Sequence, residues 1–355
     1  MRQSSEVFLA FFEKNHPIPS MKRSLFAIVF DVMVVRLVRS GTRWWWRSCA
    51  RWVGVSALAA SMVPALAFPV VVTDDQSRQV NVMAAPQRIV TLLPSLAETV
   101  CELGHCPRLV GVDRFTQWPA SIARLPRVGG GLDPDIEAIV ALRPDLVLTS
   151  GSGRVAQRLQ ALGLTVIALE PRTLADTRRV LKEVSRVLTG SDRDGTLAWV
   201  RLETGVGNAA QSIPPRSRGG TVYFEVGSGP YAAGEASFIG ELIARLGARS
   251  IVPAALGPFP KINPEFVVRA DPGVILIAAD QAAGLASRPG WAGLRAVREA
   301  RVCAFSPAEG DVLVRAGPRL AEAARLLASC LASKAPTLPT VAPGAMPPAM
   351  PALRP

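Results

Sequence analysis

Residues that could perform covalent catalysis are few in this sequence, and none of them stands in a catalytic motif. Of the two histidines in 355 residues, only His105 follows residue 67, so Ser-His or Cys-His chemistry would depend on it alone. Ser228 does not lie in a G-x-S-x-G elbow, because Val226 replaces the first glycine. Phosphate-binding G-x-x-x-x-G-K-[ST] and G-x-G-x-x-G loops are also missing. We therefore predict no catalytic residues, and an exported two-lobed α/β enzyme with paired acids remains a distant alternative.

Side chains that bind metals are equally scarce. Proteins that capture zinc or manganese ions directly need several histidines, and the chain beyond residue 67 has one. A haem iron could take a tyrosine ligand, and the two tyrosines are Tyr223 and Tyr231. Tyr223 stands in an apolar strand pattern and is expected in the core, which leaves Tyr231 as the candidate axial ligand. We predict no metal site and no cofactor.

The charge distribution argues against nucleic-acid binding. The formal net charge is +12, but the first 67 residues hold nine Lys and Arg against three acids, which is half of that excess. The remaining basic residues form no cluster of the kind that contacts phosphates. With 49% hydrophobic and 19% charged residues, the chain is expected to fold into globular domains.

The first 67 residues have the pattern of an export signal. Arg43, Arg47 and Arg51 precede an apolar stretch that ends in Ala65-Leu66-Ala67, a basic region, a hydrophobic region and an A-x-A site. We predict export to the periplasm and cleavage after Ala67, with an uncleaved anchor as the alternative. Met21 is a second candidate start. At the other end, residues 334–355 are rich in proline and are predicted to be disordered.

Four cysteines remain after this cleavage, because Cys49 is removed with the signal. An even number in an exported chain favours disulfides, although three pairings are formally possible. We predict bonds between Cys101 and Cys106 and between Cys303 and Cys330, with reduced packing cysteines as the alternative.

Short β-branched runs alternate with helical stretches after Pro86, which is typical of the α/β class. The runs are Arg88 to Leu93, Leu109 to Val112, Leu146 to Thr149 and Thr165 to Leu169, then Thr221 to Glu225, Val274 to Ile277 and Val302 to Phe305. Each series is sufficient for one small, mainly parallel sheet covered by helices. We predict a first lobe over residues 86–172 and a second over residues 218–333.

The two series also form a repeat. Glu137 begins the stretch Glu-Ala-Ile-Val-Ala-Leu-Arg-Pro, and Glu265 begins Glu-Phe-Val-Val-Arg-Ala-Asp-Pro. In both cases an apolar helix starts at the glutamate and a strand follows the proline. Between the halves, residues 173–213 predict two helices: Gly190 ends the first and Ser191 caps the second. Gly195, Gly205 and Gly207 weaken the expectation that the second helix is continuous.

These segments resemble the ABC-transporter receptors for cobalamin, haem and ferric siderophores, and the cobalamin-binding type most closely. The resemblance runs from Gln87 to Leu331. Its specific parts are Arg88-Ile-Val-Thr-Leu-Leu-Pro-Ser-Leu-Ala-Glu98, Leu109-Val-Gly-Val-Asp-Arg-Phe-Thr-Gln-Trp-Pro119 and Ile136-Glu-Ala-Ile-Val-Ala-Leu-Arg-Pro-Asp-Leu-Val147. It implies a monomer with two α/β lobes, a long rigid helix that joins them, and a ligand cleft between the lobes.

The resemblance also implies that one glutamate per lobe docks on the inner-membrane permease subunits of an ABC transporter. Glu137 and Glu265 match those positions, and an exposed acid can pair with an arginine pocket. The plainer alternative is that both acids only complement their helix dipoles.

Candidate ligand contacts lie on loops after strands, where open α/β sheets bind ligands. Phe115, Tyr231 and Phe259 match positions at which cobalamin receptors present aromatic groups, and Trp118 lies beside the first of them. Arg114 and Arg315 are candidate polar contacts, as are Asp280 and Gln281, with core packing or solvation as the alternative. The run Gly129 to Gly131 replaces a tryptophan of some cobalamin receptors. We therefore rank the ligands as cobalamin or another corrinoid, then ferric siderophore, then haem.

Overall fold

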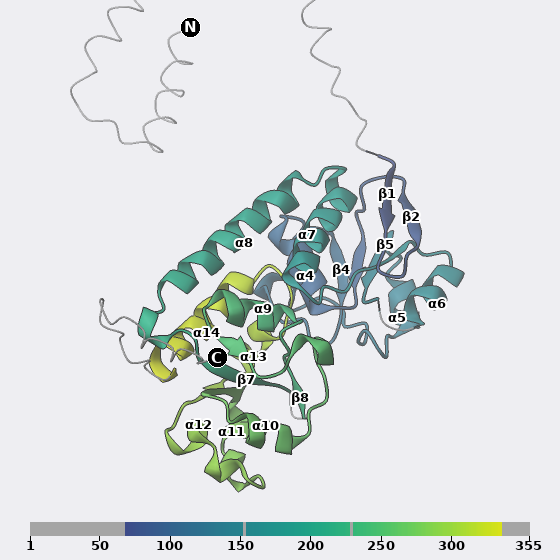
Figure 1. The fold of residues 1–355 in the computed structure, drawn as a ribbon. Coiled ribbons are helices and arrows are strands. Elements are labelled where there is room, and N and C mark those ends of the chain that lie inside the picture. The colour runs from purple at the N-terminus through teal and green to yellow at the C-terminus, as the bar shows by residue number, and fades with distance from the viewer. Residues whose placement is uncertain (1–67, 152–153, 228–229, 336–355) are drawn as a thin grey trace, which may run out of the picture. The chain divides into compact units, whose positions relative to one another are not determined.

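The computed structural model describes residues 68–151, 154–227 and 230–335 (Figure 1). Predictions about the export signal, cleavage after Ala67, Cys49, the start at Met21 and the proline-rich end from residue 336 lie outside the described residues. The predicted α/β class is confirmed: two lobes, each with a mainly parallel sheet, are joined by two helices.

The first lobe contains a four-stranded parallel sheet with the strand order β4-β3-β5-β6. Its elements are β3 (Ile89–Thr91), α4 (Pro94–Glu102), β4 (Leu109–Val112), α5 (Ile136–Ala141), β5 (Leu146–Thr149), α6 (Val155–Ala161) and β6 (Val166–Ala168). An antiparallel hairpin of β1 (Val70–Thr73) and β2 (Gln79–Val82) precedes this sheet. The predicted boundary at residue 86 does not include that hairpin.

The second lobe repeats this topology. Its elements are β7 (Thr221–Val226), β8 (Tyr231–Ala232), α9 (Phe238–Arg245), β9 (Arg249–Ser250), α10 (Pro264–Ala270), β10 (Val274–Ala278), α11 (Ala279–Ala282), α12 (Arg295–Arg298), β11 (Val302–Phe305), α13 (Pro307–Leu313) and α14 (Leu320–Lys334). Its parallel strands lie in the order β9-β7-β10-β11. In both lobes, therefore, the first strand in the chain lies between the second and the third.

Both sheets are buried on both faces, as expected for parallel strands. On β3, Ile89 and Val90 face different cores, and on β7, Phe224 and Tyr223 do the same. One of these cores is shared, because side chains of both sheets pack there with α7 (Leu174–Thr189), α8 (Arg193–Gln211) and α14. A continuous apolar core therefore joins the lobes on the side of the connecting helices.

The connecting helices begin and end largely as predicted. Thr173 and Asp176 form a capping box at the start of α7, and Gly190 ends it with φ of 79°. The helix α8 is continuous, and its N-cap is Asp192 rather than the predicted Ser191. The Oγ of Ser191 still accepts a hydrogen bond from Arg193 N at 3.3 Å.

Two of the three glycines in α8 allow neighbouring helices to approach closely. A Cβ atom at Gly195 would lie 2.2 Å from the carbonyl oxygen of Leu181 on α7. A Cβ atom at Gly205 would lie 2.5 Å from the Cβ of Ala321 on α14. These glycines therefore allow α8 to pack closely against both α7 and α14 in the shared core.

Both predicted disulfides are confirmed. Cys101 is bonded to Cys106, and Cys303 to Cys330. The second bond links β11 to α14 and so fastens the edge strand of the second sheet to the helix that packs on α8.

Candidate functional site

The loop after β4 is shaped by the buried carboxylate of Asp113. It accepts hydrogen bonds from Phe115 N at 2.8 Å and from the hydroxyl of Thr116. Burial raises the pKa of Asp113, although these hydrogen bonds and nearby arginines oppose the rise. Arg127 donates to the carbonyl oxygens of Asp113 and Thr116 and closes the turn. The turn leaves Phe115 60% exposed.

The opposite wall comes from residues 257–263 of the second lobe. Main-chain hydrogen bonds hold this segment beside β8, one of them from Gly234 N to Pro258 O at 2.9 Å. A Cβ atom at Gly234 would lie 2.6 Å from a carbonyl oxygen of the segment. Phe259 lies edge-on to Phe238, with ring centroids 6.0 Å apart. The aromatic group of this wall is therefore anchored by both backbone and side chain.

A cleft of about 660 Å³ lies between these walls, within the usual range for small-molecule sites. Most of the lining is apolar, and four of its residues are prolines. The residues are Leu93, Pro94, Ser95, Phe115, Glu170, Pro171, Arg172, Phe238, Leu256, Pro258, Phe259, Pro260, Asp311, Val314, Arg315 and Ala316. Several follow directly after β3, β4 and β6, at the carboxyl ends of parallel strands.

The charged groups of the cleft are paired. Arg172 lies 3.4 Å from Glu170, and Arg315 lies 2.8 Å from Asp311. Two carboxylates thus face two guanidinium groups, and the lining carries no formal net charge. Such a surface suits a ligand with an apolar body and polar, uncharged edges.

Arg315 belongs to the second lobe and also forms an ion pair with a residue of the first lobe. Its guanidinium lies 2.9 Å from Glu98 of α4, and Arg319 of the second lobe lies 3.3 Å from the same carboxylate. Burial raises the pKa of Glu98, and the charges and hydrogen bonds of the two arginines oppose the rise.

The structure brings three of the predicted ligand contacts to one cleft: Phe115, Phe259 and Arg315. Ligand contact by these residues stays a prediction. Arg315 differs from the expectation because its guanidinium is already bonded to Glu98, Asp311 and the carbonyl oxygen of Phe115.

Three other predicted contacts lie outside this lining. The ring of Trp118 stacks against the guanidinium of Arg319, and the ring centroid lies 5.0 Å from the Cζ atom of Arg319. Arg114 is exposed and pairs with Asp133. Tyr231 is 49% exposed on β8, and its backbone forms an isolated antiparallel β-bridge with Lys261. Arg114 also lies over the ring of Phe115, with its guanidinium carbon 5.8 Å from the ring centroid, so it is close to the cleft without being part of its lining.

The other residues considered from the sequence, Asp280, Gln281, Tyr223 and His105, all lie outside the cleft lining. Asp280 and Gln281 are outside the cleft lining on α11 and bond to each other at 3.2 Å. Tyr223 is in the core as predicted: it is buried, and its hydroxyl donates to Glu225. His105 precedes a short 3-10 turn beside a disulfide, and burial together with Arg108 lowers its pKa.

The run Gly129 to Gly131 has a local structural reason. Gly129 has φ of 84°, and a Cβ atom there would lie 2.5 Å from Asp133 O. The tight turn that results packs beside Phe115, because a Cβ atom at Gly130 would lie 3.7 Å from its ring.

Glu137 and Glu265 lie where the repeat predicted them, in the first turns of α5 and α10. Both are exposed. Within the described residues neither carboxylate has an ion pair or a hydrogen bond. Both are therefore available to a partner, although docking itself stays a prediction.

Most of the cleft lining, including Phe238 and Asp311, was missed from the sequence, as were Glu98 and Arg319 beside it. Glu98 appeared only as the last residue of the segment Arg88 to Glu98. A buried acid in an apolar helix is a signal of a buried partner, but that partner lies far away in the sequence and could not be named.

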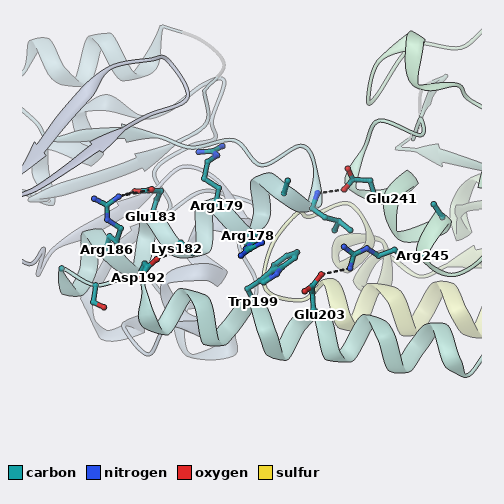
Figure 2. Close-up of a pocket in the computed structure, with 15 residues that line it drawn as sticks. Arg178, Arg179, Lys182, Glu183, Arg186, Asp192, Trp199, Glu203, Glu241 and Arg245 are labelled. Carbon is teal, nitrogen blue, oxygen red and sulfur yellow. Dashed lines mark hydrogen bonds and ion pairs between the residues drawn. The ribbon is translucent and has the colours of Figure 1, made fainter.

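A larger groove of about 1230 Å³ runs along the connecting helices (Figure 2). Its walls carry ion pairs between Lys182 and Asp192 at 2.8 Å and between Arg245 and Glu203 at 3.0 Å. Glu241 accepts a hydrogen bond from Leu174 N at 2.6 Å, which ties α9 to α7. Most of its charges thus neutralise one another.

Two further properties concern only the described residues. Residues 68–151, 154–227 and 230–335 contain no group of three or more His, Cys, Asp or Glu side chains arranged to hold a metal ion. Across the same residues, every helix is too short or too polar to span a membrane.

Comparisons with known proteins agree on the architecture. A family model described as "Periplasmic binding protein" matches residues 89–308. The heme-binding protein BhuT, solved with two hemes, superposes with a TM-score of 0.60 and 25% identity over 71% of this chain and 99% of that one.

Two sequence relatives have names that state a ligand. A cobalamin-binding protein of Halobacterium salinarum is 31% identical over 234 residues, which is 63% of this chain and 63% of that protein. A vitamin B12-binding protein of Pectobacterium carotovorum subsp. carotovorum is 26% identical over 71% of this chain and 91% of its own length. This chain therefore spans less than two thirds of the first of these relatives.

Proposed function

Because this chain belongs to the periplasmic binding protein family, we propose that it is the substrate-binding protein of an ABC importer and carries cobalamin or a related corrinoid. It is a binding protein and not an enzyme, in agreement with the names of its relatives. Export to the periplasm, predicted from the first 67 residues, is part of the proposal.

The observation that carries the corrinoid assignment is the chemistry of the cleft. Phe115 and Phe259 line it from opposite lobes, four prolines are also part of the lining, and the charged groups are paired. A corrinoid offers a flat apolar ring with amide groups at its edge. Aromatic faces bind such a ring, while Glu170 and Asp311 offer acceptors for amide N–H groups.

Haem is less well supported, although a haem-binding protein is among the structural neighbours. Among the described residues that line the cleft there is no His, Tyr, Met or Cys to ligate iron. Tyr231, the predicted axial ligand, is outside this lining. Cobalt in a corrinoid is already held by the ring, so it does not need such a ligand.

A ferric siderophore is the second candidate. Anionic iron chelates need free cationic groups, and Arg172 is the more exposed arginine of the cleft. Its pairing with Glu170, and the presence of Asp311, favour a neutral ligand instead. Arg315 is unavailable while it bonds Glu98.

Delivery would use the two exposed glutamates. Glu137 and Glu265 each present an unpaired carboxylate on the first turn of a short helix, one per lobe. We propose that these carboxylates dock on arginines of the permease subunits, and that ATP hydrolysis belongs to partner subunits.

The test is a titration of the mature protein, starting at Phe68, with cyanocobalamin, followed by calorimetry and tryptophan fluorescence. We expect saturable one-to-one binding. Phe115→Ala and Phe259→Ala should each weaken it roughly tenfold or more, the loss expected for one buried aromatic contact. Tyr231→Ala is the matched control, since this exposed aromatic lies outside the cleft.

Three outcomes decide the assignment. A loss with Tyr231→Ala equal to that with Phe115→Ala would contradict the placement of the site. Saturable binding of a ferric siderophore, without binding of cyanocobalamin, would replace the ligand and keep the importer. Binding of hemin with a tyrosinate-to-iron absorption band would favour the haem alternative.

A further inference from the structure

Glu98 is a fully buried acid near the cleft. It lies in α4 of the first lobe with none of its side chain exposed, yet its partners come from the second lobe. Arg315 Nη1 lies 2.9 Å from Oε1, while Arg319 donates through Nε to Oε2 and through Nη2 to Oε1, both at 3.3 Å. Both arginines are largely buried, with 9% and 13% of their side chains exposed.

Each arginine also holds a residue of the loop that carries Phe115. Arg315 Nη2 donates to the carbonyl oxygen of Phe115 at 3.0 Å. Arg319 covers the ring of Trp118 at 5.0 Å. The same two side chains thus contact α4 and the loop after β4, and they do so from the segment that lines the second-lobe side of the cleft.

The energetics make this contact hard to open. A buried carboxylate without its cationic partners is strongly unfavourable, because its desolvation is no longer offset. Separation of the lobes at this point would expose or strand three charges together. The shared apolar core, with Gly195 and Gly205 of α8, holds the lobes at the connecting helices. The buried charges and this core therefore both oppose separation of the lobes.

We propose that Glu98, Arg315 and Arg319 form an interlobe clamp, which sets the width of the cleft and holds Phe115 in position. They are positioning residues and not ligand contacts, which also explains why Arg315 and Trp118 face protein groups. The effect on ligand binding rests on the proposed function. The effect on lobe separation does not.

The test measures the distance between the lobes without ligand. Nitroxide labels are attached at Leu162→Cys in the first lobe and Arg269→Cys in the second, since both positions are exposed. Double electron–electron resonance then gives the distance distribution. We expect Glu98→Gln to broaden it at least about twofold or to add a longer distance, because opening is no longer opposed by charge separation.

The matched control is Glu225→Gln. Glu225 is another buried carboxylate in a bidentate pair, with Arg288 at 2.6 and 2.9 Å, but both residues belong to the second lobe. The Glu225→Gln substitution should lower the melting temperature by about as much as Glu98→Gln does, and it should leave the distance distribution between the lobes unchanged. Equal distributions for the two variants would overturn the clamp. If Glu98→Gln does not fold, Arg319→Gln, which keeps Arg315 on Glu98, gives the same comparison.

Ligand affinity provides the second measurement. Glu98→Gln should weaken cyanocobalamin binding about tenfold, because a binding-competent cleft is then populated only part of the time, whereas Glu225→Gln should not. Unchanged affinity in Glu98→Gln would contradict the positioning role. If the wild-type protein binds no cyanocobalamin, the proposed ligand fails, and the distance measurement still decides whether the clamp exists.

Discussion

Glu137 and Glu265 occupy the same place in two lobes of the same strand order, each in the first turn of the helix before the third parallel strand. The residue two positions earlier caps each helix: Asp135 accepts from Ala138 N at 2.9 Å, and Asn263 accepts from Glu265 N at 3.0 Å. The caps hold both first turns, so the two carboxylates are presented on ordered backbone.

Reversal of both charges, Glu137→Lys with Glu265→Lys, should abolish import, because lysine would repel the arginines of the permease. Each single reversal should reduce uptake less. Ligand affinity should stay within about twofold, since neither residue lines the cleft. Uptake by cells and calorimetry on the purified variants check the two expectations.

Asp194→Lys is the control for the docking test, since Asp194 is also an exposed acid in the first turn of a helix. Uptake should continue with this variant. A parallel loss of ligand binding in the double reversal would indicate a folding defect instead of a docking role.

Substitution of alanine for each of the three glycines of α8 should change the stability in a direction that depends on what surrounds the glycine. Gly195→Ala and Gly205→Ala should each destabilise the protein by about 1 to 3 kcal/mol, because the added methyl group overlaps α7 or α14. Gly207→Ala has open space and should stabilise by up to about 1 kcal/mol. Urea unfolding measures all three, and an equal sign for Gly205 and Gly207 would refute the close packing.

The two disulfides should contribute unequally. On the chain-entropy argument, the bond across 27 residues stabilises by about 3.5 kcal/mol and the bond across 5 residues by about 2 kcal/mol. Replacement of Cys303 and Cys330 by alanine should therefore lower the free energy of unfolding more than replacement of Cys101 and Cys106. The reverse order would mean that loop length does not govern their effect.

Asp74 should contribute to the loss of folding stability at low pH. Burial alone would raise its pKa, but hydrogen bonds from Arg78 and from the backbone N–H groups of Gln76, Arg78 and Ala168 outweigh it, so the pKa is lowered. The unfolded state then takes up the proton first as the pH falls. This stabilisation is present above about pH 4 and is lost below it.

The measurement for Asp74 is the melting temperature of the wild type and Asp74→Asn between pH 6 and pH 2. The wild type should be the more stable at pH 6, and the difference should shrink towards pH 2. A constant difference would mean that Asp74 acts without a change of its charge.

Local periodicity and spacing were enough to predict Gly190 at the end of α7, the equivalent positions of Glu137 and Glu265, and seven strands, which are β3, β4, β5, β6, β7, β10 and β11. The even number of cysteines favoured disulfides, and both predicted bonds are present, although the count alone allowed three pairings. The hairpin β1-β2 was missed although Val70 to Thr73 is itself a β-branched run, and β8 and β9 were missed because two residues give no pattern to recognise.

The packing of the two lobes set which side chains share the cleft. Phe115 and Phe259 line it, whereas Trp118, Arg114 and Tyr231 are not part of its lining. Arg315 was expected to meet ligand, whereas it bonds Glu98, which is 217 residues away in the chain. A buried charged side chain needs an oppositely charged partner, and the packing of the folded chain determines which residue that is. Glu98 and Arg315 are far apart in sequence and meet only because the two lobes assemble around one core.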